Sequence, residues 1–339
     1  MLSLLPSVAW HEIPEEAILC HDVRNPIERS AILARKGTTV TADQLRDLFG
    51  HGVLEIHLAL QEPDDVAEDE AATRLAAAIA GAGIRAEDAH FGQSSLVGAD
   101  RGMLRVNRAL VDRVNVLDGV LLLTGEADRP VEAGTTLGVV KCAPLFLPES
   151  TLMEVEDVGP VVEIEPFQTR RVALIAPAER LRGGAFDRAR AALSDAVSWY
   201  GSALDQVVGA EATVQALADA YTEVRQGGAE LVLAAGASGT DPLDVVFEGL
   251  RQAGGEVLQI GIPAEPGTAC WIGRLGAVPV LGLASCELFG QPGALDLLLP
   301  RLFTGEALDQ DLLRRLAFGG LLLGPSRIAP YHTARPGAE

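Results

Sequence analysis

At 339 residues the chain is long enough for two domains, because single hydrophobic cores usually stop growing at about 250–300 residues. Apolar residues make up 48% of the chain and aromatic residues 4%, which favours a core of Leu, Val, Ile and Ala in an α/β fold and excludes a disulfide-rich or disordered protein. The formal net charge is −20, and Lys36 and Lys141 are the only lysines, so we expect no basic face for nucleic acid.

The first part of the chain, residues 1–168, predicts a small α+β domain. Its clearest signal is Thr41-Ala42-Asp43-Gln44, a capping-box pattern that opens a helix through Phe49, with Gly50 as a stop. The other elements expected in this part are a strand near 53–58, a helix over 68–79 and strands at 119–123 and 137–140.

From residue 169 to residue 308, apolar strand and helix patterns alternate, which predicts a doubly wound, mainly parallel α/β sheet with helices on both faces. The expected strands lie at 172–176, 204–208, 231–235, 256–260 and 278–283. The expected helices lie at 186–197, 214–224 and 242–253, with a last one beginning at Pro292. Residues 309–339 form a third segment, with one helix near 309–317 and a poorly ordered end.

Three loops are expected at one edge of this sheet, because parallel strands all end on the same side. They comprise residues 177–184, 236–244 and 284–291. Ligands of open α/β sheets bind at that edge, so these loops form the candidate site. Arg180 and Arg182 in the first loop are either solvated or paired with a phosphate group.

The second loop begins with Gly236-Ala237-Ser238-Gly239-Thr240-Asp241, between a strand and a helix. Its small residues let backbone amides face outward, and Asp241 is predicted to be the helix N-cap, with Pro242 as the first helical residue. In one interpretation the loop is an anion site. In the other it is only a well-capped connection.

Several catalytic classes find no support in the sequence. Residues 169–308 contain no histidine, so a Ser–His or Cys–His pair is not expected there. Neither lysine follows a G-x-x-x-x-G segment, which excludes a P-loop. Cys286 in the third loop is the sharpest thiol candidate, with a buried inert thiol as the competing interpretation.

The cysteines and the N-terminus bear on the compartment. Cys20, Cys142, Cys270 and Cys286 are far apart and form no C-x-x-C pair, which fits a reducing compartment and a cytoplasmic protein. The N-terminus lacks the basic region of a signal peptide, and no apolar run reaches the about 20 residues that span a bilayer. We therefore expect no membrane association.

One set of residues points to a family. The strand at 231–235 runs into residues 236–241 with Asp244 beyond, and Gly282-Leu283 leads into the third loop. On these residues, the segment from Arg171 to about Gly305 resembles the molybdopterin-binding domain shared by molybdopterin molybdotransferases, gephyrin-like proteins and competence-damage-inducible proteins. The resemblance implies that these loops bind the pterin and its phosphate, and that an aspartate helps to hold Mg²⁺.

A second set is similar to a narrower group, the molybdopterin-binding half of proteins that carry a molybdenum cofactor cytidylyltransferase domain. Its residues are Pro266-Gly267, Gly273-Arg274-Leu275 and Cys286, with Lys36-Gly37 and residues 130–134 in the first half. This likeness covers most of the chain. It implies a cytidylyltransferase or a molybdoenzyme maturation factor as a partner, and a homo-oligomer that is a dimer or a trimer.

The chain departs from the molybdotransferase pattern at three places, two of which overlap the first and third loops. Residues 176–181 replace Thr-Gly-Asp/Asn-Glu-Leu, and residues 282–287 replace Gly-Leu-Pro-Gly-Asn-Pro. Glu265-Pro266-Gly267-Thr268 replaces Lys-Pro-Gly-Lys, so both lysines are lost. Losing these cations near an oxyanion argues against molybdate insertion by this chain.

The implied function is binding of molybdopterin, or of a nucleotide-modified form of it, during molybdenum cofactor biosynthesis or delivery. The residues expected to bind the pterin are Glu179, Gly236, Ala237, Ser238, Gly239, Thr240, Asp241, Ser285 and Cys286. Asp241 and Asp244 are the expected Mg²⁺ ligands. Two alternatives stay open: a Mg²⁺-dependent transferase or hydrolase acting on the pterin phosphate, and a non-catalytic scaffold that has lost the ligand.

Overall fold

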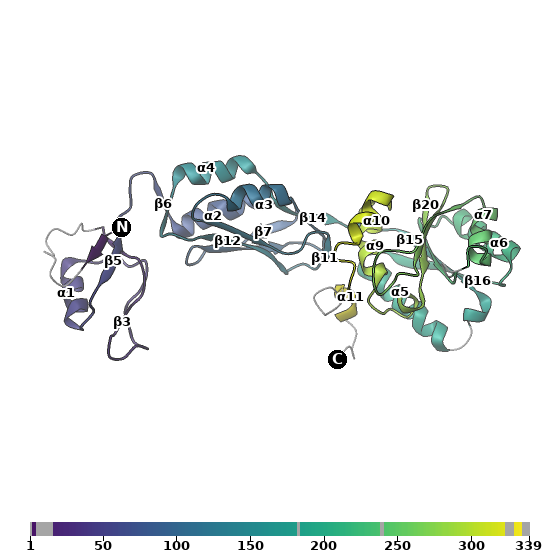
Figure 1. Ribbon diagram of the computed structural model, residues 1–339, viewed down its shortest axis with the longest axis horizontal. Helices are drawn as coiled ribbons and strands as arrows, with labels where there is room; N and C mark the ends of the chain where they lie inside the picture. The colour runs from purple at the N-terminus through teal and green to yellow at the C-terminus, as the bar shows by residue number, and fades with distance from the viewer. Residues whose placement is uncertain (1, 5–15, 182–183, 238–240, 323–328, 334–339) are drawn as a thin grey trace. The chain divides into compact units, whose positions relative to one another are not determined.

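In the computed structural model the chain divides into two compact units (Figure 1). The structure describes residues 2–4, 16–181, 184–237, 241–322 and 329–333. Unit 1 comprises Met1–Ala99, Arg105–Glu126 and Ala133–Ile164. Unit 2 comprises Asp100–Leu104, Ala127–Glu132 and Glu165–Glu339, so two short segments of the first half fold with the second half.

Unit 1 begins with a small sheet of strands β1, β5 and β2, a β3–β4 pair and helix α1. The bounds of these elements are β1 Leu2–Leu4, β2 Ile18–Leu19, β3 Val23–Arg24, β4 Ile32–Ala34, α1 Ala42–Gly50 and β5 Ile56–Ala59. The predicted capping box is confirmed at the start of α1: Gln44 N donates to Thr41 Oγ1 over 3.3 Å, and Thr41 N donates to Gln44 Oε1 over 2.9 Å. Leu45 and Leu48 of α1 are buried in a core with Ile56 and Leu58 of β5.

The rest of unit 1 is built on a four-stranded antiparallel sheet in the order β10-β12-β8-β7. The elements here are β6 Asp65–Ala67, α2 Glu68–Ile79, β7 Ile84–Ala86, β8 Gln93–Gly98, α3 Arg108–Asn115, β10 Val120–Thr124, β12 Thr136–Cys142, β13 Phe146–Pro148 and α4 Glu149–Val158. The predicted helix over 68–79 is confirmed as α2, because its small apolar residues recur at helical spacing and are buried. Arg74 of α2 pairs with Glu149 and Glu156 of α4, at 2.7 and 2.9 Å.

Unit 2 contains a six-stranded sheet in the order β16-β15-β17-β20-β19-β18. Its strands are β15 Arg171–Pro177, β16 Ala203–Ala210, β17 Leu231–Ala235, β18 Glu256–Ile260, β19 Trp271–Leu275 and β20 Val278–Leu283. The prediction of a mainly parallel sheet is confirmed, because β16, β15, β17 and β20 pair in parallel. The antiparallel strand β19 was not predicted, and it forms a tight hairpin with β20 through Gly276 and Ala277.

Helices cover both faces of this sheet (Figure 1). They are α5 Gly184–Trp199, α6 Val214–Gln226, α7 Val245–Gln252, α8 Ser285–Leu288, α9 Ala294–Thr304, α10 Gln310–Leu316 and α11 Pro330–Thr333. Along β15, Val172 and Leu174 join the core with α5 and α9, whereas Ala173 and Ile175 join the core with α6 and α7. Burial on both faces explains why the strand is a continuous apolar run.

Two segments from the first half dock on α5 and α9 within unit 2. These segments carry part of β9 Gly102–Val106 and all of β11 Arg129–Val131, which pair antiparallel; β14 Val162–Pro166 leads into unit 2. Trp199 Nε1 donates to Glu132 Oε1 over 2.8 Å, and Arg101 lies over the Trp199 ring at 4.7 Å. Arg301 is almost fully buried and pairs with Asp128 at 3.2 Å.

The chain's C-terminal segment also packs into unit 2. His332 of α11 lies 2.9 Å from the carboxylate of Asp296 in α9, and Tyr331 donates its hydroxyl to the same carboxylate. Burial, followed by the negative charge of Asp296, raises the pKa of Tyr331 and Tyr200 well above their ordinary values. Residues 169–308 contain no histidine, and the folded unit gains His332 because the tail packs onto α9. A poorly ordered end was also predicted for the tail. Its last residues, 334–339, lie outside the described ranges.

Among the described residues, every helix is too short or too polar to span a bilayer.

Candidate functional site

The strand register brings the three expected loops to one edge of the six-stranded sheet. Ile175 of β15 pairs with Ala234 of β17, and Ala235 of β17 pairs with Leu283 of β20. The three strands run in the same direction, so the chain leaves each of them on the same side. The three loops therefore start side by side.

The connections diverge at β15 and β17. From β15 the chain passes through α5 to β16, on one side. From β17 it passes through α7 to β18, on the other side, and α7 packs on the opposite face from α5. In open α/β sheets, ligands bind outside the carboxyl ends of the strands at such a switch point. The loops after β15 and β17 flank this position.

The loop after β17 opens with two residues in left-handed conformations. Gly236 has φ +102° and Ala237 has φ +59°. The alanine conformation costs about 1–3 kcal/mol, and such strain clusters at ligand sites. A Cβ on Gly236 would also lie 3.5 Å from Pro177 of β15, which shows how closely the two loops approach. Ser238, Gly239 and Thr240, which were predicted to bind the pterin, lie outside the described residues.

The prediction that Asp241 is the N-cap of the next helix is wrong. Helix α7 begins at Val245, and its N-cap is Asp244, whose Oδ1 accepts from Val246 N over 2.9 Å. Asp241 Oδ1 accepts from Leu243 N over 3.0 Å in a turn that precedes the helix. Pro242 fits this turn as well as it fits a first helical turn, so the sequence pattern did not separate the two registers.

The two aspartates each have one carboxylate oxygen engaged in a local turn or cap. Within the described ranges, no group of three or more His, Cys, Asp or Glu side chains could hold a metal ion. Mg²⁺ in proteins is often bound by one or two carboxylates, with substrate phosphates and water completing its shell. Asp241 and Asp244 thus do not form a complete metal site by themselves, although carboxylates are the ligand type that Mg²⁺ takes.

The loop after β15 forms a short 3-10 helix, Ala178–Leu181, and carries Glu179 exposed to solvent. The Arg180 side chain and Arg182 lie outside the described residues. Glu179 therefore marks the accessible rim of this edge.

The loop after β20 forms helix α8, which begins with Ser285 and Cys286, whose side chains are not described. The next residue, Glu287, is fully buried, and its Oε1 accepts from Ala294 N at the start of α9 over 3.2 Å. A Cβ on Gly267 would lie 2.5 Å from the same oxygen. No sequence pattern predicted a role for Glu287, and the nearby glycines were the signal that could have pointed to it.

Glu265 and Thr268, which stand where the molybdotransferase pattern has lysines, form a polar pair. Thr268 Oγ1 donates to Glu265 Oε2 over 3.3 Å, and Glu265 N donates to Gly320 O over 2.8 Å. The segment is thus held against the C-terminal part of the chain, and one lysine position carries a carboxylate. This charge disfavours an oxyanion at that point.

No protein-family profile matches the sequence, and no curated protein matches it. Among solved structures, the chain is similar to a molybdopterin biosynthesis MoeA protein from Pyrococcus horikosii, with 14% identity, a TM-score of 0.28, and coverage of 69% of this chain and 80% of that one. A molybdopterin biosynthesis protein from Mycobacterium abscessus has 13% identity, a TM-score of 0.27, and coverage of 45% and 98%. The protein CinA from Thermoplasma acidophilum has 15% identity, a TM-score of 0.28, and coverage of 35% and 88%. Likeness at this level does not place the chain in a family.

Proposed function

We propose that unit 2 binds molybdopterin, or a nucleotide-modified form of it, in molybdenum cofactor biosynthesis or delivery. The observation that carries the proposal is the pair of left-handed residues, Gly236 and Ala237, directly after the central strand β17 at the switch point of the sheet. The residue-by-residue resemblance of the same loop supplies the identity of the ligand. The phosphate of such a ligand needs donors, and backbone amides supply them even in a protein of net charge −20.

In this proposal the three loops contact different parts of the ligand. The amides of residues 236–241 take the phosphate, while the loops after β15 and β20, with Glu179, Ser285 and Cys286, flank the pterin. Asp241 and Asp244 are the residues that would hold a Mg²⁺ accompanying the phosphate. When bound, Mg²⁺ would neutralise the phosphate charge beside two carboxylates. We propose in addition that the protein is cytoplasmic, that it forms a homo-oligomer, and that its partner is a cytidylyltransferase or a molybdoenzyme maturation factor.

Fluorescence of co-purified pterin, after expression in a host that makes the cofactor, tests the ligand. We expect near-stoichiometric retention by the wild-type chain and a loss of at least tenfold for Gly236→Ala, because a side chain strains this φ of +102°. Gly254→Ala is the matched control, since Gly254 has φ +82° and lies after α7, at the other end of the sheet. We expect both variants to lose stability, because each places a side chain at a positive φ. Equal pterin retention by the two would contradict the placement of the site.

The same preparation separates a binder from an enzyme. A binder keeps the pterin intact, whereas a Mg²⁺-dependent transferase or hydrolase consumes an adenylylated pterin or releases pyrophosphate. We expect retention without turnover. A chain that folds normally but retains no pterin would instead favour the scaffold that has lost its ligand.

Asp241→Asn tests the proposed Mg²⁺ site. The amide oxygen keeps the hydrogen bond to Leu243 N, so the melting temperature should stay nearly constant. One negative charge is lost from the shell of a hard cation, so the Mg²⁺-dependent part of pterin affinity should fall by about tenfold. Titration with and without Mg²⁺ measures this. Unchanged pterin affinity in the presence of Mg²⁺ would show that Asp241 is not a Mg²⁺ ligand. It would not bear on the proposed backbone anion site.

A further inference from the structure

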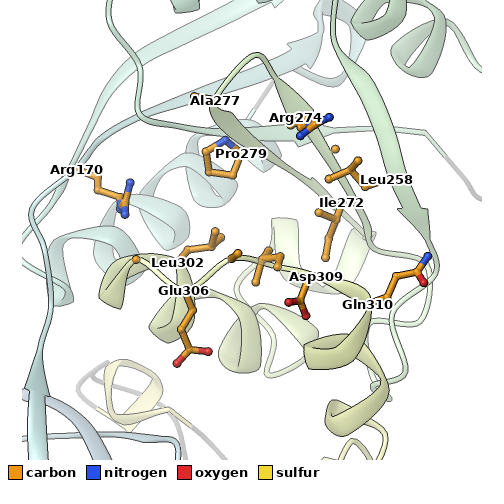
Figure 2. A pocket seen from close by; sticks show the side chains of 14 residues that line it. Arg170, Leu258, Ile272, Arg274, Ala277, Pro279, Leu302, Glu306, Asp309 and Gln310 are labelled. Carbon is orange, nitrogen blue, oxygen red and sulfur yellow. The ribbon is translucent and has the colours of Figure 1, made fainter.

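A cavity of about 540 Å³ opens at the other end of the six-stranded sheet (Figure 2). It lies where β15 and β20 begin, between the β19–β20 hairpin and the segment that follows α9. Small-molecule sites typically occupy about 300–1,000 Å³. The cavity is therefore large enough for a ligand, and it is separate from the loops at the carboxyl edge.

The floor of the cavity is aliphatic. Ile272 and Leu302 line it and are otherwise buried in the core, with Pro279 beside them. Leu258 of the edge strand β18 also lines it and remains 43% exposed. An apolar ligand body would cover this surface and remove it from water.

Arg170 is the cation that distinguishes this cavity. Its guanidinium points into the space, whereas the carboxylate of Glu306 points away from it (Figure 2). Arg170 Nη2 donates to Gln168 Oε1 over 3.2 Å, and its Nε is buried without a hydrogen-bond partner. Glu230 forms its ion pair with Arg171, and its pKa is lowered first by the backbone hydrogen bond from Arg171 and then by the charges of Arg171 and Arg170. Among the described residues, no carboxylate forms an ion pair with Arg170 itself within 4.0 Å.

The other charged groups around the cavity are engaged by the protein. Arg274 pairs with Glu256. Glu306 lies 3.8 Å from Arg301, and Asp309 caps α10 by accepting from Leu312 N over 2.8 Å. Arg170 is thus the charge that a ligand can complement.

Gln168 holds Arg170 in place. Its backbone N donates to Phe303 O over 2.6 Å, and its side-chain Nε2 donates to Thr304 O over 3.1 Å, both at the carboxyl end of α9. The Arg170 backbone N donates to Ser202 Oγ over 2.9 Å. The end of α9 therefore fixes Gln168, whose side-chain oxygen accepts from the Arg170 guanidinium.

We propose that this cavity is a second ligand site, which takes a small organic carboxylate with an aromatic or aliphatic body. The carboxylate accepts hydrogen bonds from Arg170, in the charge-assisted geometry that guanidinium groups favour. The body covers Ile272, Leu302 and Pro279. This site is independent of the proposed pterin site.

The proposal is tested by NMR titration of the full chain at neutral pH with two probes, 3-phenylpropionate and 3-phenylpropanamide. The two probes share one body and differ in charge. We expect the carboxylate to bind about tenfold more tightly than the amide, because it alone forms the charged hydrogen bonds with Arg170. Equal affinity of the two probes, or no binding of either, would overturn the proposal.

Two variants place the probe in the cavity. Arg170→Gln should abolish the preference for the carboxylate, whereas Arg171→Gln, the neighbouring arginine paired with Glu230, should preserve it. Ala277→Trp, in the exposed hairpin turn that lines the cavity, should weaken both probes about tenfold by filling the space. A carboxylate preference that survives Arg170→Gln, or unchanged affinity of both probes in Ala277→Trp, refutes the site. Pterin retention should be unchanged in all three variants, so the two proposals fail separately.

Discussion

Replacing Asp296 with alanine is expected to lower the free energy of unfolding of unit 2 by about 3–5 kcal/mol. Asp296 is 3% exposed, and its carboxylate accepts from Tyr331, from His332 and from Gly293 N. Alanine would leave a buried phenol and a buried imidazole without their acceptor, and would remove the capping interaction at the start of α9. The C-terminal helix α11 would then lose its polar attachment to α9.

Urea unfolding followed by tryptophan fluorescence measures this loss, since Trp199 lies beside Tyr331 with ring centroids 6.1 Å apart. Asp296→Asn is the matched control, because an amide keeps one acceptor oxygen and the same shape, and its loss should be clearly smaller. Asp311→Ala removes an exposed carboxylate on α10 and should change little. A loss below about 1 kcal/mol for Asp296→Ala would show that the buried network does not hold the C-terminal segment.

The elements that the sequence predicted well are those with a complete local signal. Helix α2 and strands β17, β18 and β20 have the predicted bounds, because their apolar residues recur at helical spacing in α2, run continuously in β17 and alternate with polar residues in β18. The start of α7 was wrong by three residues, because Asp241 and Asp244 are both good caps and only packing decides between them. Strand β19 was missed, since its Gly273 and Arg274 interrupt the apolar pattern.

At the candidate site, the sequence predicted which loops meet, and could not predict what supports them. Parallel strands end at the same edge of a sheet. Strand direction alone therefore predicted that the loops of Pro177 and Gly236 lie side by side. The bond from Ala294 N to Glu287 and the pairing of His332 with Asp296 join residues in different elements. No spacing in the sequence encodes such contacts. The same holds for Arg170, whose surroundings come from α9 and from the β19–β20 hairpin.

Replacing Gly282 with alanine should lower the free energy of unfolding of unit 2 by about 1–3 kcal/mol or more, through overpacking. Gly282 of β20 lies directly opposite Trp271 of β19, and a Cβ on it would lie 1.9 Å from the indole Nε1. Trp271 is fully buried and packs edge-on against Phe247 of α7, with ring centroids 5.0 Å apart. Both rings are fully buried, so the added methyl group forces either the indole or the strand pair to shift. Gly184→Ala, where a Cβ meets only the Arg188 side chain at 3.6 Å, is the control.

A double-mutant cycle shows whether the indole is the cause. Trp271→Leu alone should also destabilise unit 2, because it leaves a cavity beside Phe247. If the new methyl group collides with the indole, the smaller leucine side chain makes room for it. The double variant should then lose clearly less free energy of unfolding than the sum of the two single losses. Urea unfolding of all four proteins measures the coupling. Additive losses would mean that Gly282→Ala acts through the strand backbone and not through Trp271.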